Sequence, residues 1–294
     1  MGHGRPRGEG HAELGAPYGA WEREYLAAFP ELGAVLARMV ELTTAQLAEP
    51  QQDILHNRLC AALVWRMGRE AGLEAPRLRL ALIADLLHNV AKEDPRALLS
   101  AREVLERSAT MVGRLRAAGY FRSSPVFWSR PSLFDNPRIG ANRALVHHVT
   151  GALEAERLMD ELGGFSRAEI DEVQAAILTH STGYHYLREA VDAEARAPGA
   201  WRALFPEPEA APEVLAHDAD LVSQFVPETV LPAQSKWRRL ARERWGATSA
   251  KQEARIIGEI LARLKDEARS ALGRRLAQEH WTALEAQLKA IFRC

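Results

Sequence analysis

The chain has 294 residues, of which 47% are hydrophobic and 26% charged, and its formal net charge is −1. This length and apolar content predict a well-packed globular protein. The near-neutral charge gives no general attraction to nucleic acid or to an anionic membrane, so neither is expected as a partner.

The two cysteines, Cys60 and Cys294, do not indicate a disulfide framework, which favours a reducing, cytoplasmic location. Residues 1–17 are rich in glycine and lack the apolar segment of a secretory signal. No run of 18 apolar residues predicts a membrane span. We expect a flexible tail over residues 1–20, a helical domain over 21–230 and a helical extension, packed on it, over 231–294.

The fold class expected is all-α. Alternating β-branched segments are missing, and the good helix formers Ala, Leu, Arg and Glu dominate. One or two helices are expected over 21–48. The next, over 51–71, has an apolar stripe at a period close to 3.6, with His56 beside the stripe and Gly72 as a C-terminal stop.

A further helix is expected from Pro76 to His88-Asn89. Residues 120–137, which include Arg122 and Arg130, predict a long irregular loop that is either a lid or a simple connection. Beyond the loop, one helix is expected over 138–162, and a second begins at the capping box of Ser166 and Glu169 and ends at His180. A short helix is expected to begin at 184–186, and another covers 213–225. Residues 235–292 read as long amphipathic helices that pack on the bundle or form a homodimer.

Histidines recur in several of these helices, and a helical bundle can bring such side chains together at its axis. One buried histidine is more often structural, but histidines on five helices are harder to explain by packing. The set is His56, His88, His147, His148, His180, His185 and His217, with Asp218 and Asp220.

The order of these residues resembles the signature of the HD-domain superfamily. Residues 84–92, ADLLHNVAK, resemble the family's ALLHDIGK, and residues 218–221, DADL, resemble its DADRL segment. His147 with Gly151 resembles the H-x-x-x-G of members with a two-metal site. The resemblance covers about residues 50–226. It implies an HD-like helical bundle, one or two divalent metal ions, and hydrolysis of phosphate esters or nucleotides, with a minority branch of diiron oxygenases.

The resemblance, together with the position of neighbouring polar residues, assigns roles to individual residues. We expect His56, His88 and Asp220 to hold the principal metal, and imidazole and carboxylate ligands suit Mn, Fe, Co, Ni or Zn. Lys92 would bind a phosphate of a small, nucleotide-like substrate, and Asp85 would add a catalytic or supporting carboxylate. The further candidates are His147 and His180 as ligands of a second metal, His148, His185, Arg122 and Arg130 as substrate contacts, and Asp218 as a carboxylate that orients a ligand histidine.

Position 89 departs from the family, because the sequence has Asn where the HD pair has Asp. An amide oxygen is neutral and cannot bridge two cations as an anion does, so Asn89 is expected to be a weak fourth ligand. This favours a mononuclear or depleted site. It leaves two alternatives open. One is a catalytically weakened HD protein that acts as a ligand-binding or regulatory module. The other is a diiron oxygenase, which the Asn disfavours most because that enzyme needs a bridged pair of metal ions.

Overall fold

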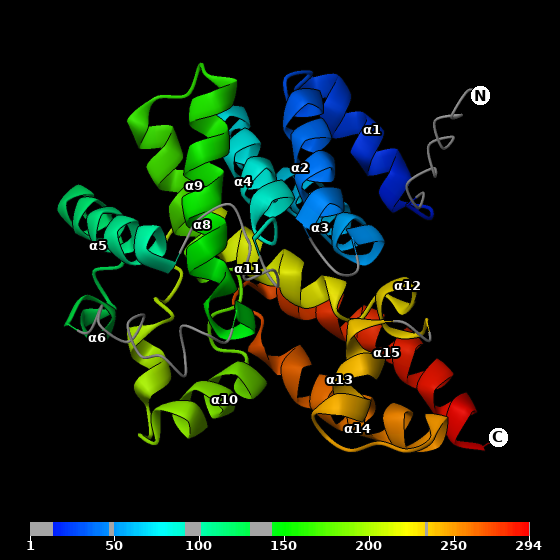
Figure 1. Ribbon diagram of the computed structural model, residues 1–294. Coiled ribbons are helices and arrows are strands. Elements are labelled where there is room, and N and C mark those ends of the chain that lie inside the picture. The colour runs from blue at the N-terminus through cyan, green and yellow to red at the C-terminus, as the bar shows by residue number, and fades with distance from the viewer. Residues whose placement is uncertain (1–13, 47–49, 92–100, 130–142, 233–234, 294) are drawn as a thin grey trace, which may run out of the picture.

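The computed structural model describes residues 14–46, 50–91, 101–129, 143–232 and 235–293. These residues form helices and turns and no β-strand, which confirms the all-α fold (Figure 1). None of the helices in this part of the chain is long and apolar enough to cross a membrane.

The first helices agree with the expected segments. Helices α1 (Tyr18–Ala28) and α2 (Leu32–Gln46) occupy the first segment, so residues 18–20 are helical instead of belonging to the tail. Helix α3 (Pro50–Glu70) begins at a proline, which suits the first turn, where backbone N–H groups have no partner. It is followed by Gly72, whose φ of 68° is readily adopted by glycine.

Helix α4 (Ala75–Leu87) ends immediately before His88. Helices α5 (Ala101–Ala118) and α6 (Pro125–Ser129) follow, so the segment expected to be irregular contains a short helix. Helix α8 (Arg143–Leu162) ends at two glycines with positive φ, and α9 (Arg167–Thr179) starts with the expected reciprocal capping box of Ser166 and Glu169.

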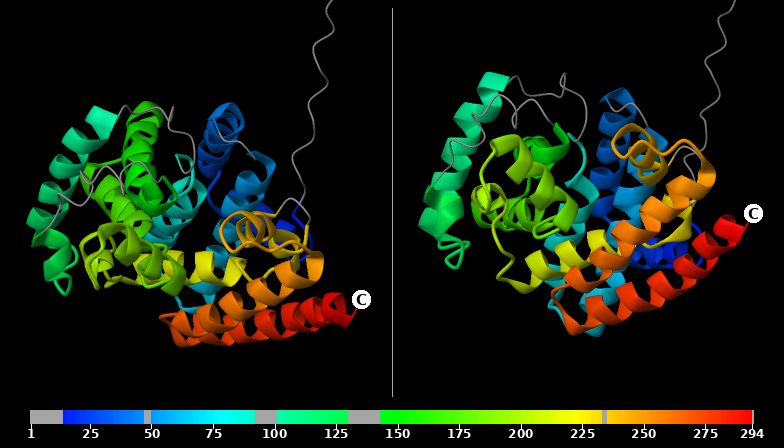
Figure 2. Two further views of the ribbon diagram at one scale, coloured as in Figure 1. Left: turned by 60° about the horizontal axis from the view of Figure 1, so that its bottom comes forward. Right: turned by 90° about the horizontal axis from the view of Figure 1, so that it is seen from below.

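The remaining chain is also helical. Helix α10 (His185–Ala195) and the 3₁₀ turn η2 (Ala200–Ala203) precede α11 (Ala211–Ser223) and the short α12 (Pro227–Val230). The C-terminal segment forms α13 (Lys236–Glu243), α14 (Ala250–Leu264), η3 (Lys265–Glu267) and α15 (Ala271–Arg293). Figure 2 shows α14 and α15 side by side at the C-terminal edge of the molecule.

Helices α3, α4, α9 and α11 pack against one another and form the centre of the bundle. Helix α8 covers α9, α1 covers α3, and α15 lies against α11. His56, His88, His180 and His147 lie close together where these helices meet. The C-terminal helices therefore contact the bundle through α11, the helix that carries Asp220.

Candidate metal centre

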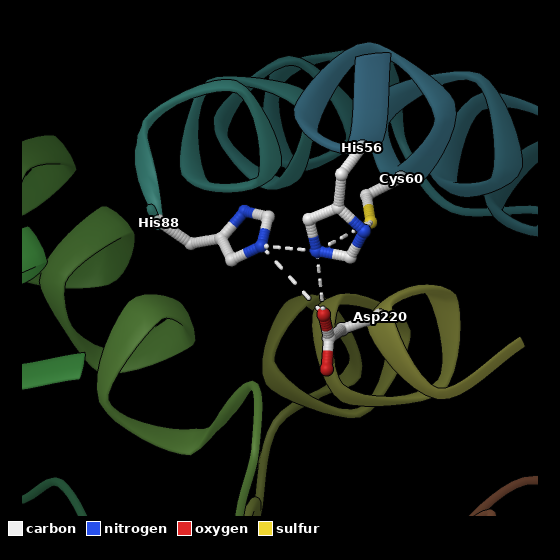
Figure 3. Close-up of side chains that lie close together, drawn as sticks. All are labelled: His56, Cys60, His88 and Asp220. Atoms are coloured by element: carbon white, nitrogen blue, oxygen red, sulfur yellow. Dashed lines mark hydrogen bonds and ion pairs between the residues drawn. The ribbon is translucent and has the colours of Figure 1, made fainter. Parts of the chain in front are cut away.

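Three central helices bring His56, His88 and Asp220 together (Figure 3). His56 comes from α3, His88 follows the last turn of α4, and Asp220 lies on α11. Asp220 Oδ1 lies 2.9 Å from His56 Nε2 and 3.7 Å from His88 Nε2, and the two Nε2 atoms are 3.2 Å apart. With Cys60, these residues form a cluster that could hold a metal ion.

The hydrogen bonds of each ring determine which nitrogen faces the cluster. His88 Nδ1 donates to the Asp85 carbonyl oxygen at 2.7 Å, which leaves Nε2 with its lone pair. Ser223 Oγ donates to the carbonyl oxygen of Asp220 and so accepts from His56 Nδ1 at 3.2 Å. In the neutral rings, His56 Nε2 and His88 Nε2 then face Asp220 Oδ1 as acceptors. Three acceptors at these distances repel unless a cation or an added proton lies among them.

Asn89 lies at the edge of the cluster. Its Nδ2 is 2.7 Å from His88 Nε2, and its Oδ1 is buried without a hydrogen-bond partner in the described part of the chain. Burying an amide oxygen in this way costs free energy. Rotation of the amide by half a turn would exchange the positions of the two atoms and direct the oxygen to the cluster. The residue therefore fits the role of a neutral oxygen ligand.

His147 of α8 and His180, which follows α9, form a second facing pair. Their Nε2 atoms are 3.0 Å apart, and the Nδ1 of His180 donates to the Ile177 carbonyl oxygen at 2.6 Å. The His180 ring also lies 4.7 Å from the ring of His88, centroid to centroid. Four imidazoles therefore run in one row from His56 through His88 and His180 to His147.

Cys60 is a member of the cluster that the sequence analysis did not assign. It lies one turn after His56 on α3, and this i, i+4 spacing was the available signal. Its Sγ is 3.8 and 3.7 Å from His56 Nδ1 and Nε2, so the thiol lies beside the ring. It does not lie along the line on which Nε2 would bind an ion. In this arrangement Cys60 supports the His56 ring, while His56, His88 and Asp220 present the ligand atoms.

Asp220 is held from both sides. Tyr184 Oη lies 2.8 Å from Oδ2 and donates to it, and Gln224 Nε2 lies 3.3 Å from Oδ1. Burial raises the pKa of this carboxyl, but its hydrogen bonds with His56 and His88 outweigh burial and hold the pKa well below the usual range. Asp220 is therefore an anion at neutral pH, as a metal ligand must be.

The Asp85 carboxyl makes no hydrogen bond among the described residues, so its expected catalytic or supporting role stays a prediction. Its backbone oxygen orients His88, while both carboxyl oxygens are buried without a hydrogen-bond partner among the described residues. Burial raises the pKa of Asp85 well above its usual range, and the charge of Asp220 adds to this. The observed contribution of Asp85 is the position of the His88 ring, which its backbone oxygen fixes.

The cluster opens into a cavity of about 420 Å³, a size typical of small-molecule sites. His56, Asn89, His147, His180 and Asp220 line its inner end. The outer walls come from α10 and α13. They contribute apolar residues, two carboxylates and three basic side chains, namely Tyr186, Leu187, Glu189, Ala190, Ala193, Glu194, Lys236, Arg239, Leu240 and Arg244.

A second hollow, of about 520 Å³, lies between Trp21, Trp65 and nearby charged residues. Its arginines are already paired with acids of the same hollow: Arg69 with Glu24 at 3.1 Å, and Arg66 and Arg275 with Glu70. These contacts join α1, α3 and α15. The feature is explained by packing, and the cavity at the histidines is the candidate site.

The structure does not bring three of the expected substrate contacts to this cavity. His148 is buried, bonds the Leu204 carbonyl oxygen at 2.8 Å and stacks on Phe205. His185 is buried beside Tyr186, with Nδ1 3.4 Å from Glu267. Arg122 is exposed and donates to the Gly119 carbonyl oxygen. His148 faces away because consecutive helical residues point about 100° apart and His147 takes the inward position.

Asp218 orients a histidine, but that histidine is outside the cluster. Its Oδ1 lies 3.0 Å from His217 Nδ1, and the carboxylate accepts hydrogen bonds from the backbone N–H groups of Arg269 and Ser270. Asp218 therefore joins α11 to the start of α15. Lys92 and Arg130 lie outside the described residues, so their expected phosphate and substrate contacts stay predictions.

Comparisons with known proteins did not identify a related protein. No family model, no curated protein and no solved structure matches this chain. The resemblance to the HD-domain superfamily therefore rests on the quoted residues, and the candidate site rests on its own geometry.

Proposed function

We propose that this protein is a metal-dependent hydrolase of a phosphate ester or nucleotide, of the HD type. The observation that carries the proposal is the convergence of three ligand atoms, His56 Nε2, His88 Nε2 and Asp220 Oδ1, at the inner end of a cavity. With both rings neutral, such a set is stabilised by a bound cation or an added proton. Neutral imidazoles and one carboxylate are typical ligands of Mn, Fe, Co, Ni or Zn.

The principal ion would be held by His56, His88 and Asp220, with Asn89 as a weak fourth ligand. A bound ion of this kind polarises a phosphoryl oxygen and lowers the pKa of a water molecule towards neutrality. Neighbouring groups of the chain hold the three ligand side chains in the orientation that an ion would need. The Asp85 carbonyl oxygen fixes the His88 ring, Ser223 fixes His56, and the Tyr184 hydroxyl fixes the Asp220 carboxylate.

The facing pair His147 and His180 would hold a second ion or contact the phosphate. Burial and the neighbouring His88 lower the pKa of His180 well below its usual range, so this ring is neutral and able to bind a metal. Because Asn89 cannot bridge two ions as a carboxylate does, one ion is the state we expect. Lys92 keeps its proposed role in binding phosphate.

Asn89 favours a second candidate, a weakened HD protein that binds a ligand without turning it over. A diiron oxygenase on the same scaffold would need a bridged pair of irons. The three candidates differ in the metal that the purified protein contains and in the reaction that it catalyses. Metal analysis combined with a broad phosphatase and nucleotidase screen separates them.

We expect bound metal, and turnover that is lost in His88→Ala together with the metal. His280→Ala on α15 is the matched control, since it removes a histidine outside the cluster. A folded protein that binds no metal and turns over no phosphate ester with any added cation would overturn the proposal. Bound metal without turnover would favour the binding module, and two irons with oxygen-dependent turnover would favour the oxygenase.

A further inference from the structure

The segment that joins α9 to α10 is held firmly beside the cluster. Thr182 Oγ1 donates to the Pro206 carbonyl oxygen at 2.8 Å, and His217 Nε2 donates to the Thr182 carbonyl oxygen at 2.7 Å. The Tyr184 hydroxyl, at the end of the segment, bonds Asp220. Because all of these contacts are buried, the segment has a fixed position relative to the three ligand atoms.

Two hydroxyls at this place make no contact of that kind. Ser181 follows His180 directly and is 3% exposed, and its Oγ has no hydrogen-bond partner in the described part of the chain. Tyr186 lies in the first turn of α10 and is 8% exposed, and its hydroxyl makes no hydrogen bond to any described residue. Both side chains line the cavity at the histidines. Since buried hydroxyls are normally hydrogen-bonded, these two are donors available to a ligand.

The Tyr186 ring is fixed by packing against Trp237 of α13. The two rings meet edge-on, with 5.5 Å between centroids, and Trp237 Nε1 donates to Gln224 Oε1 at 3.1 Å. Helix α13 is held in turn by Arg238, which binds Glu253 of α14 at 2.5 Å. The Tyr186 hydroxyl therefore has a fixed position and needs no costly ordering when a ligand binds.

Both hydroxyls are uncharged groups at neutral pH. Burial raises the pKa of the Tyr186 phenol above its usual range, and the charges of Asp220 and Glu267 add to this effect. A neutral hydroxyl can both donate and accept a hydrogen bond, so it pairs with hydroxyl, ether and carbonyl oxygens alike. Ser181 and Tyr186 are therefore suited to an uncharged polar group of a ligand.

The rest of the α10 wall disfavours a phosphate and suits an organic group. Three apolar side chains follow Tyr186 on the cavity side of this helix, namely Leu187, Ala190 and Ala193. The charged residues that α10 adds to the lining are the acids Glu189 and Glu194, and the basic residues come from 236–244. Glu189 is paired with Arg263 of α14 at 2.8 Å, which leaves the wall without a surplus of positive charge. A phosphate on this wall would meet carboxylates, whereas an uncharged group meets apolar surface and two hydroxyls.

We propose that Ser181 and Tyr186 bind the uncharged, oxygen-bearing organic group of the substrate, in particular a sugar. This inference rests on the proposed function and deepens it, because the phosphate of the ester would lie at the cluster and the sugar along α10. Hydrogen bonds from two fixed neutral donors select a group that carries oxygen atoms over a hydrocarbon of similar size. The two residues determine specificity and take no part in the bond that breaks.

Isothermal titration of the full, cobalt-loaded chain tests this assignment with two phosphonates, whose carbon–phosphorus bonds resist phosphatases. We expect the phosphonate analogue of ribose 5-phosphate to bind at least tenfold more tightly than methylphosphonate. Ser181→Ala and Tyr186→Phe should each weaken binding of the ribose analogue at least fivefold and leave binding of methylphosphonate within twofold of wild type. Ser181→Ala should not lower the midpoint of urea denaturation, since its hydroxyl has no partner to lose.

Thr179→Val is the matched control. The Thr179 hydroxyl is buried two residues before Ser181, but it donates to the carbonyl oxygens of Ala175 and Ala176 in its own helix. This variant should bind both phosphonates as the wild type does.

Equal losses for the two phosphonates in the Ser181 and Tyr186 variants would overturn the inference, because the hydroxyls would then contact the phosphate group. Unchanged binding of the ribose analogue in both variants would also overturn it. The phosphonate analogue of AMP distinguishes two sources of the sugar. Tighter binding than that of the ribose analogue indicates a nucleotide, and equal or weaker binding indicates a sugar phosphate.

The proposed function fails separately. A chain that shows the expected binding pattern but hydrolyses no phosphate ester keeps the sugar site and loses the hydrolase. A chain that hydrolyses sugar phosphates as well in Ser181→Ala and Tyr186→Phe as in the wild type keeps the hydrolase and loses the sugar site.

Discussion

Gly151 of α8 lies directly against the backbone of His88: a Cβ at Gly151 would be 2.4 Å from the His88 carbonyl oxygen. This contact explains the glycine four residues after His147. The site needs α8 close to the end of α4, and only a residue without a side chain allows that approach.

We predict that Gly151→Ala destabilises the protein by about 1–3 kcal/mol, because the helices must separate or His88 must move. The change should also weaken metal binding, since the His88 ring is displaced. Urea denaturation and cobalt titration measure the two effects. Gly113→Ala on α5, where nothing lies within 4 Å, is the control and should be neutral or slightly stabilising. Equal effects of the two substitutions would contradict this explanation.

Asn89→Asp should strengthen metal binding by tenfold or more, because it adds a second carboxylate to the ligand set. In the metal-free protein the same change should lower the free energy of unfolding, since a new buried charge would lie near Asp220. Calorimetric titration and denaturation with a chelator present measure these opposite effects. A gain of stability without metal would show that Asn89 lies in a more polar environment than its burial indicates.

Tyr184→Phe should reduce metal affinity about 10- to 100-fold, as is usual when a group that orients a ligand is removed. The phenol donates to Asp220, and its loss leaves the carboxylate free to rotate. Tyr25→Phe removes a hydroxyl from a buried tyrosine elsewhere, whose partner is Glu22. It should leave metal binding unchanged, and a similar loss in both variants would point to general destabilisation.

The metal-free protein should lose stability as the pH falls below about 6.5. Burial lowers the pKa of His148 to about 4, so between these values the unfolded chain binds a proton that the folded chain does not. At pH 5 this difference amounts to about 2 kcal/mol relative to pH 7.5. The buried His180 acts in the same direction. His148→Gln should reduce the loss by that amount in urea denaturation, and an unchanged pH dependence would exclude His148 as its source.

Cys60→Ser should leave cobalt stoichiometry and affinity within a few-fold of wild type, because the thiol lies beside the His56 ring. The cobalt-loaded wild-type protein should accordingly lack a sulfur-to-metal charge-transfer band near the ultraviolet. Such a band, lost in Cys60→Ser, would place the thiol among the ligands. It would mean that the Cys60 side chain turns towards the ion when metal binds.

The central residues could be predicted from sequence because their pattern is local. His56 stands beside a helical stripe, His88 ends an apolar helix, and Asp220 lies on a strongly apolar segment, so their burial follows from helical periodicity. Their convergence on one site was expected from the resemblance to the order of residues in the HD-domain superfamily. The capping box of Ser166 and Glu169 is equally local, and the all-α fold follows from composition.

The errors and omissions depend on tertiary packing. His185 was expected to contact substrate because it follows His180 between two tyrosines, but its Nδ1 lies 3.4 Å from Glu267, which is 82 residues later in the chain. The α13 cations were read as part of an amphipathic tail. Which of its faces meets the cavity is decided by Glu253 and Trp237, and a pattern of charges on one helix cannot reveal that. Cys60 was overlooked because a thiol in an apolar stretch resembles core packing.

The chain of contacts from Trp237 through Gln224 to Asp220 bears on how this protein can be shortened. A fragment that stops before residue 231 would keep every histidine of the bundle and all the residues that resemble the HD signature. It would nevertheless expose Gln224, remove one wall of the cavity and release the carboxylate it helps to hold. The boundary between bundle and extension is thus a poor place to cut, and an expression fragment intended to retain the site needs α13.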